Sequence, residues 1–106
     1  MSVLHIETTT QFEEKILQNN EVSIVDFYAD WCMPCKMQAP ILDQLAQERS
    51  DVVIAKVNVD DLTDIAQRYG IQTIPTIMVF QGETMKQQVA GVQTKDGLEQ
   101  MIDNAK

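Results

Sequence analysis

Three apolar stretches predict buried strands at the centre of this protein. Residues 22–28, 52–59 and 76–81 are rich in β-branched and aromatic side chains and are shorter than most helices. The first stretch is apolar on both faces near its middle, which is typical of a central strand covered on both sides. Two charged residues interrupt these stretches, Asp26 in the first and Lys56 in the second.

Apolar residues at helical spacing predict two helices in the first half of the chain. The first covers residues 10–18, with Thr10 as its N-cap residue and Glu13 completing a capping box. The second begins at the only cysteine pair and continues to about Gln47. The apolar residues that recur at helical spacing in it are Met37, Ile41, Leu42 and Leu45.

The second half of the chain predicts a short helix, a hairpin and a final helix. The short helix opens at residues 61–64, and the final helix begins near Thr94. A turn at residues 81–83 joins the preceding strand to an antiparallel partner at residues 84–90. A short strand at residues 3–6 completes the set. We therefore expect an α/β fold in which a mixed sheet of about five strands is flanked on both faces by about four helices.

Composition and charge narrow the classes of protein and of partner. The 106 residues suit one domain, 1–106, that buries a core without metal or disulfide support. The formal charge of −8 would repel a phosphate backbone, so we expect no nucleic-acid partner. The first residues lack the regions of a signal peptide, and no stretch suits a membrane span. We expect a soluble cytoplasmic protein, and in that compartment cysteine pairs are more often catalytic than structural.

The two cysteines, Cys32 and Cys35, are separated by two residues and stand beside the only tryptophan. This spacing also begins many zinc sites, but zinc needs two further ligands, and His5 is the only other candidate of the usual kind. The pair follows a predicted strand and opens a predicted helix, which is the context of a redox motif. A thiolate that attacks a disulfide forms a mixed disulfide, and a second thiol three positions along can resolve it.

The start of the helix distinguishes the two cysteines. Unpaired N–H groups and the positive end of the macrodipole stabilise a thiolate at a helix N-terminus, so Cys32 is the predicted nucleophile. Cys35 projects to the same side one turn later, is expected to be the more shielded, and is the predicted resolving thiol. Pro34 has a fixed φ and no N–H donor, which suits the helical turn that holds the two sulfurs together.

Other residues near the pair have both a functional and a structural interpretation. Burial would raise the pKa of Asp26 and let it transfer protons near neutral pH, although a strand aspartate can simply bond a neighbouring backbone group. Lys56 on the adjacent strand is its expected partner, although a lysine can also extend its charge into solvent. Trp31 is either a core residue or an apolar docking surface. The local sequence does not predict whether the Ile74–Pro75 bond is cis.

Two functions from other classes fit parts of the sequence. Met33 and Met37 add soft sulfurs to the cysteine pair, and such a set could bind Cu(I). The apolar surface around Trp31 and Ile74 could instead serve a binding subunit without redox activity. Methionines are more often core or surface residues than metal ligands, so these functions are alternatives to thiol–disulfide exchange.

Several motifs together resemble the thioredoxin family over nearly the whole chain. The segments in that family's order and spacing are Val25 to Lys36, Pro40, Lys56 to Asp60, Tyr69 to Ile71, Ile74 to Thr76, Gly82 and Gly91. The resemblance implies the thioredoxin fold, with Cys32 as the attacking thiol and Cys35 as the resolving thiol. It also implies that Asp26 is a buried proton-transfer carboxyl with Lys56 beside it.

The same resemblance implies a docking surface for protein substrates. Pro75 matches the family's cis-proline, which packs against the disulfide, and the backbone of Ile74 would pair with an extended substrate. The implied surface comprises Trp31, Met33, Pro34, Ile74, Pro75, Gly91 and Val92. Met33 departs from the family, which usually has glycine there, and leaves the reduction potential open. Tyr28 is a milder departure, since tryptophan is more usual.

The expected function is the reduction of protein disulfides by an enzyme that cycles between a dithiol and the Cys32–Cys35 disulfide. By resemblance, a flavin-containing reductase that uses NADPH, thioredoxin reductase, would recharge it. The chain itself would need no cofactor and would act as a monomer. An oxidase or isomerase is the alternative within the same class, and a strongly oxidising disulfide would favour it.

Overall fold

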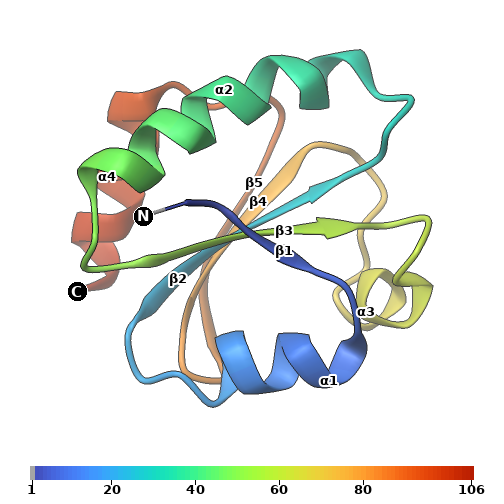
Figure 1. The fold of residues 1–106 in the computed structure, drawn as a ribbon, viewed down its shortest axis with the longest axis horizontal. Coiled ribbons are helices and arrows are strands. Elements are labelled where there is room, and N and C mark those ends of the chain that lie inside the picture. The colour runs from blue at the N-terminus through green and yellow to red at the C-terminus, as the bar shows by residue number, and fades with distance from the viewer. Residues whose placement is uncertain (1) are drawn as a thin grey trace.

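Residues 2–106, which the computed structural model describes, contain a mixed sheet of five strands (Figure 1). The strands are β1 Leu4–Ile6, β2 Val22–Tyr28, β3 Val53–Asn58, β4 Thr76–Gln81 and β5 Thr84–Ala90. Their order across the sheet is β1-β3-β2-β4-β5, and β1 and β2 are parallel to β3. β4 is antiparallel to both of its neighbours. The buried strand β2 lies at the centre, as its apolar faces predict.

Helices cover both faces of the sheet (Figure 1). On one face lie α2 Met33–Glu48 and α4 Lys95–Ala105. On the other lie α1 Thr9–Phe12, its π-helical continuation η1 Glu13–Leu17, and α3 Thr63–Arg68. The predicted order of elements and the expected α/β architecture are confirmed. No helix within residues 2–106 combines the length and the apolar character needed to cross a bilayer.

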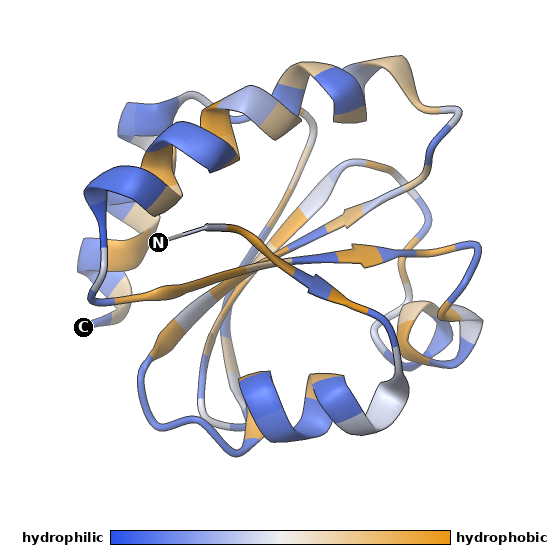
Figure 2. Cartoon of the chain, in the orientation of Figure 1, coloured by the Kyte–Doolittle hydropathy of each residue, from blue (hydrophilic) through white to orange (hydrophobic). Residues whose placement is uncertain are grey.

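Each face of the sheet packs its own core, because successive side chains of a strand point to opposite faces. Ile24 belongs to the core beneath α2 and α4, whereas its neighbour Val25 belongs to the core on the face of α1 and α3. Figure 2 shows apolar residues along the strands and an alternation of apolar and polar residues along the helices that pack against them. Asp26, at the next position of β2, therefore points to the face that α2 covers.

The buried face of α2 differs from the one that the apolar spacing suggests. Met37, which the spacing groups with the apolar residues, is 64% exposed. Gln38 is fully buried instead, on the same face as Cys35, Leu42 and Leu45. At this part of the helix a methionine therefore faces solvent and a glutamine faces the protein interior.

The first helix is capped two residues earlier than predicted. Thr8, not Thr10, is the N-cap residue, and its hydroxyl accepts a hydrogen bond from the Gln11 N–H at 3.0 Å. The side chain of Gln11 accepts in turn from the Glu7 N–H at 2.7 Å. The capping-box spacing occurs twice in this segment, as Thr8 with Gln11 and as Thr10 with Glu13. The fold uses the first of the two, so the predicted cap is wrong.

The boundaries of other elements also differ slightly from the prediction. α3 begins at Thr63, and among the described residues no side chain caps it, because the preceding position is occupied by Leu62, which is buried in the core. β3 is one residue shorter at each end than residues 52–59, because its pairing with β2 extends only from Val53 to Asn58. Neither difference moves a residue of the site.

Candidate active site

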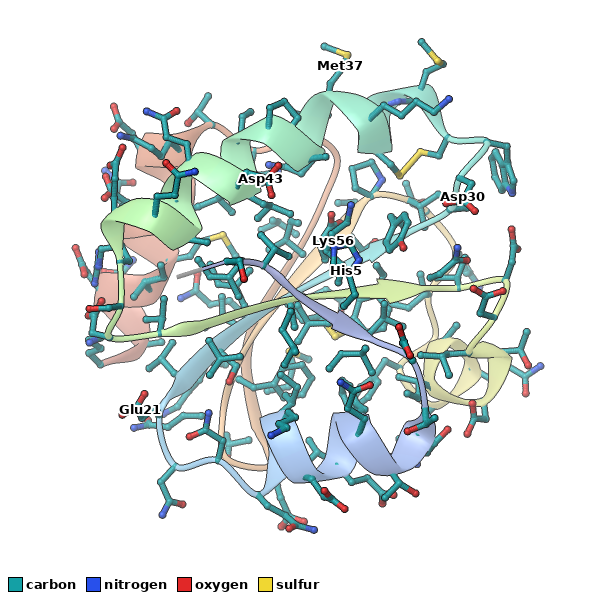
Figure 3. The ribbon with its side chains drawn as sticks, in the orientation of Figure 1. His5, Glu21, Asp30, Met37, Asp43 and Lys56 are labelled. Atoms are coloured by element: carbon teal, nitrogen blue, oxygen red, sulfur yellow. A yellow bond between two sulfur atoms is a disulfide. The ribbon has the colours of Figure 1, made fainter. Side chains whose placement is uncertain are left out.

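The cysteine pair lies at the start of α2 and is oxidised to a disulfide, the yellow bond in Figure 3. Cys32 is the N-cap residue of the helix, and its Sγ accepts a hydrogen bond from the Cys35 N–H at 3.2 Å. The two Cα atoms are 5.3 Å apart, so the turn that contains Pro34 brings the side chains within bonding reach. The predicted place of the pair at a helix start is confirmed.

The hydrogen bond, rather than burial, distinguishes the two cysteines. Cys32 is 4% exposed and Cys35 is 3% exposed, so the shielding expected for Cys35 applies to both in the disulfide form. The Sγ of Cys32 faces a backbone N–H of the first helical turn. A thiolate at Cys32 would keep this donor and would be stabilised by it.

A loop from elsewhere in the chain reaches the disulfide, and a second loop is bonded to the first. The Ile74–Pro75 peptide bond is cis, and the Ile74 carbonyl oxygen lies 3.8 Å from the Cys32 Sγ. In the disulfide form this sulfur carries no proton, so the approach is a contact rather than a hydrogen bond. The Gly91 N–H donates to the Pro75 carbonyl oxygen at 2.8 Å, which joins the loop after β5 to the cis-proline turn. The fold thus brings Cys32, the cis-proline turn and Gly91 together.

Trp31 is a surface residue, not a core residue. Its side chain is 70% exposed, and its indole Nε1–H donates to the Asp60 carboxylate at 2.9 Å. Met33 is 66% exposed, and Val92 is also an exposed apolar residue. Trp31 and Met33 flank Cys32 in the sequence, and Val92 follows Gly91, whose N–H is bonded to the cis-proline turn. The core interpretation of Trp31 is therefore excluded.

Asp26 is fully buried and lies directly opposite Lys56 in the pairing of β2 with β3. Burial raises the pKa of its carboxyl to about 7, and the positive charge of Lys56 opposes this rise. Neither carboxyl oxygen has a hydrogen-bond donor among residues 2–106. The structural alternative, in which Asp26 bonds a neighbouring backbone group, is therefore excluded. The direction of the pKa shift is the one that burial predicts.

Lys56 lies on the side of the sheet that α2 covers (Figure 3). Its Nζ lies 4.2 Å from the centroid of the Tyr28 ring, which is a cation–π contact. Both residues line a cavity of about 130 Å³ that Cys35 and Ala39 also line. This cavity therefore extends from Lys56, which lies opposite Asp26, to Cys35.

Among the described residues, 2–106, no group of three or more His, Cys, Asp or Glu side chains is placed to hold a metal ion. Met37 points outward from α2, away from the disulfide (Figure 3). The set of sulfurs considered for Cu(I) is therefore not assembled in the disulfide form.

Several contacts of the site were not predicted from the sequence. They include the Trp31–Asp60 hydrogen bond, the approach of the Ile74 carbonyl, and two hydrogen bonds between the Gln38 side chain and the backbone of Gln93. The role of Gln38 could have been suspected from the sequence, because a polar residue at helical spacing from Leu42 and Leu45 needs hydrogen-bond partners when it is buried. The other two contacts join residues distant in the sequence, and no local pattern indicates them.

A dithiol that closes to a disulfide at a helix start can exchange electrons with other disulfides, and the fold and the pair define a protein of thiol–disulfide exchange. The family model for thioredoxin matches residues 3–104 of this chain. Thioredoxin 1 of Synechococcus elongatus is 39% identical over 104 residues, 97% of each protein. The thioredoxin of Rickettsia bellii is 37% identical over 98 residues, 92% of this chain and 93% of its own.

Solved structures agree with these relatives. A mutant thioredoxin from Halobacterium salinarum has a TM-score of 0.88 at 34% identity, over 97% of this chain and 89% of its own. Plasmodium falciparum thioredoxin has a TM-score of 0.88 at 30% identity, over 98% of this chain and 100% of its own. The chain belongs to the thioredoxin family, has the thioredoxin fold, and is a dithiol–disulfide oxidoreductase whose redox-active pair is Cys32 and Cys35.

Proposed function

We propose that this protein is a thioredoxin that reduces disulfides of other proteins, with Cys32 as the nucleophile and Cys35 as the resolving thiol. The observation that carries the proposal is the disulfide at the start of α2, with the Cys35 N–H bonded to the Cys32 Sγ. The relatives that bear the name thioredoxin support it. Met33 stands where the family usually has glycine, so the active site is a Cys-Met-Pro-Cys variant.

The first step begins from the reduced dithiol. The Cys32 thiolate attacks one sulfur of the substrate disulfide and forms a mixed disulfide with it, while the other substrate sulfur leaves as a thiolate and takes up a proton. The Cys35 N–H and the positive end of α2 stabilise the attacking thiolate. These groups favour Cys32 over Cys35 as the attacking residue.

The second step closes the disulfide. Cys35 gives up its proton, and its thiolate attacks the Cys32 Sγ of the mixed disulfide. The Cys32–Cys35 bond forms as the bond between Cys32 and the substrate sulfur breaks. The substrate thiolate then takes up a proton, and the substrate leaves as a dithiol. Asp26, with a pKa of about 7, is suited to accept the Cys35 proton near neutral pH. The cavity of about 130 Å³ is lined by Cys35 and by Lys56, which lies opposite Asp26, and it is large enough for water molecules that would carry this proton toward Asp26.

An extended segment of the substrate would dock along the apolar surface beside the pair. We assign to this docking surface Trp31, Met33, Pro34, Ile74, Pro75, Gly91 and Val92. The exposure of Trp31, Met33 and Val92 supports the assignment, as does the Ile74 carbonyl 3.8 Å from the Cys32 Sγ. A substrate strand that pairs with the Ile74 backbone would present its sulfur to Cys32.

The cellular role follows from the direction of electron flow. A flavoprotein that uses NADPH, thioredoxin reductase, would return the disulfide to the dithiol, so this protein would carry electrons to protein disulfides without a cofactor of its own. We propose that it acts in the cytoplasm, as a monomer and as the single domain 1–106. The net charge of −8 supports a set of partners without nucleic acids or anionic membrane surfaces.

Turnover of insulin disulfides with a dithiol reductant tests the roles of the two cysteines. Cys32→Ser should abolish turnover, because the nucleophile is lost. Cys35→Ser should accumulate a mixed disulfide with the substrate, visible as a covalent adduct without reductant. Met85→Ser changes an exposed sulfur-containing side chain on β5 and should keep wild-type turnover. An active Cys32→Ser variant would exclude the proposed mechanism.

The reduction potential separates a reductase from an oxidase or isomerase. Equilibration of the Cys32–Cys35 pair with glutathione should give a potential near that of thioredoxin, about −270 mV. A potential of about −180 to −120 mV would contradict the reductase and favour the alternative. Met33→Gly, measured beside the wild type, reports what the variant residue contributes.

A further inference from the structure

Gln38 is a fully buried glutamine one turn after Cys35, on the same face of α2 as Leu42. A buried amide costs free energy unless its polar atoms are hydrogen-bonded. A methionine or leucine would fill nearly the same volume without this cost. Packing alone therefore does not explain a glutamine at this position.

Both ends of the Gln38 amide are bonded to the backbone of a single residue, Gln93. The Gln38 Oε1 accepts from the Gln93 N–H at 2.7 Å, and the Gln38 Nε2 donates to the Gln93 carbonyl oxygen at 3.1 Å. One bond would restrain a distance, whereas two bonds to one residue also restrain its orientation. The side chain thus acts as a clamp between α2 and the loop that follows β5.

The clamped loop is itself joined to the cis-proline turn. The Gln93 Nε2 donates to the Gly91 carbonyl oxygen at 3.1 Å, and the Gly91 N–H donates to the Pro75 carbonyl oxygen at 2.8 Å. Gly91 has a φ of +90°, a conformation that glycine adopts easily. A series of hydrogen bonds therefore extends from Gln38 in α2 through residues 91–93 to the cis-proline turn.

The loop held in this way carries part of the proposed docking surface. Val92 is an exposed residue of the loop, and Gly91 precedes it. Gln38 is completely enclosed, so it does not touch a docked substrate and acts only through the loop. Its distance in sequence from Gln93, 55 positions, means that the clamp exists only in the folded protein.

We propose that Gln38 is a positioning residue whose two hydrogen bonds to Gln93 hold Gly91 and Val92 in the conformation that receives a protein substrate. A loop ordered before binding reduces the entropy lost on docking, so Gln38 raises the affinity for protein disulfides without taking part in the exchange chemistry. This inference rests on the proposed function, since the docking surface belongs to it.

Gln38→Met is the test, because methionine has nearly the shape of glutamine and lacks both amide groups. With insulin as the substrate, KM should rise about three- to tenfold, whereas kcat at saturation should change less than about twofold. With a small aromatic disulfide, which is too small to reach the loop, kcat/KM should equal that of the wild type. Gln38→Leu should behave in the same way, which assigns the effect to the lost amide rather than to the new thioether.

Gln87→Met is the matched control. The Gln87 Nε2 donates to the Met101 carbonyl oxygen at 2.9 Å, so this variant also loses a bond from a side chain to the backbone. That bond joins the middle of β5 to α4 and does not involve the loop. The KM for insulin should therefore stay at the wild-type value.

Hydrogen exchange of the Gln93 amide, measured without substrate, separates this inference from the proposed function. Gln38→Met should accelerate that exchange about tenfold, since the acceptor of the Gln93 N–H is lost. A wild-type KM in Gln38→Met, an equal loss toward the small disulfide, or an unchanged Gln93 exchange rate would overturn the inference. A wild-type protein that fails to reduce insulin would overturn the proposed function, and with it the docking role, even if Gln93 exchange responds.

Discussion

Replacing Asp26 by asparagine should make the oxidised protein more stable at neutral and alkaline pH. Asp26 is fully buried, and burial raises its pKa from 3.8 to about 7. The folded chain therefore binds this proton more tightly than the unfolded chain, so the stabilisation is complete below pH 4 and is lost as the pH rises through 7. About three pH units at 1.36 kcal/mol each correspond to about 4 kcal/mol. Asparagine has nearly the same shape as aspartate and no charge, so the variant does not lose this stabilisation as the pH rises.

Urea unfolding of the oxidised wild type and of Asp26→Asn between pH 4 and pH 9 measures this effect. The other carboxyl groups titrate in both proteins, so the difference between their free energies of unfolding isolates Asp26. We expect a small difference at pH 4 that grows to about 4 kcal/mol in favour of Asp26→Asn above pH 8. A difference that stays constant from pH 4 to pH 9 would refute the reasoning, because the pKa of Asp26 would then be the same in both states.

Asp64→Asn is a control for which the expected change in stability has the opposite sign. The hydrogen bond from the Thr9 hydroxyl lowers the pKa of the Asp64 carboxyl. A carboxyl group whose pKa is lowered by folding stabilises the folded state at every pH above its unfolded-state pKa. This stabilisation is lost as the pH falls through the folded-state pKa. Asp64→Asn should therefore reduce stability at neutral pH, where Asp26→Asn increases it.

Two further substitutions test the docking surface and the core. Asp60→Ala removes the carboxylate that accepts the hydrogen bond of the Trp31 indole, so the fluorescence anisotropy of Trp31 should fall. The signal is specific because Trp31 is the only tryptophan. Unchanged emission and anisotropy would contradict a restraining role for that bond. Leu42→Ala, at a fully buried position of α2, should lower the free energy of unfolding in urea by about 2–5 kcal/mol. Met37→Ala, on the exposed side of the same helix, should lower it by less than about 0.5 kcal/mol. Equal losses at Leu42 and Met37 would mean that α2 buries a different face.

Local patterns were sufficient for most elements of the fold. The strands β2, β4 and β5 begin and end where the apolar runs and the turn at Gly82 predict, and α4 begins at Lys95, close to the predicted start near Thr94. These signals lie within a few residues of one another, since strand alternation and capping are short-range properties. The position of the cysteine pair at a helix start follows for the same reason, because it needs only a strand, a short connection and a helix in succession.

Where two local solutions were available, the sequence did not choose between them. Thr8 and Thr10 both begin a segment with capping-box spacing, and in the folded chain Thr8 is the N-cap residue. Met37 and Gln38 are neighbours on α2, and hydropathy favours burying the methionine. The fold buries Gln38 because the loop after β5 supplies the backbone groups that satisfy its amide.

The sequence by itself therefore determined the order of elements, the redox pair and the buried carboxyl, because each is written in residues close together along the chain. Only the tertiary structure decided what surrounds the pair: the Ile74 carbonyl beside Cys32, the Asp60 carboxylate on Trp31 and the Gln93 backbone on Gln38. Each of these contacts joins segments that are distant in sequence, and the strand order of the sheet sets which of them meet. For this physical reason the redox chemistry could be predicted from the sequence, whereas the shape of the proposed docking surface could not.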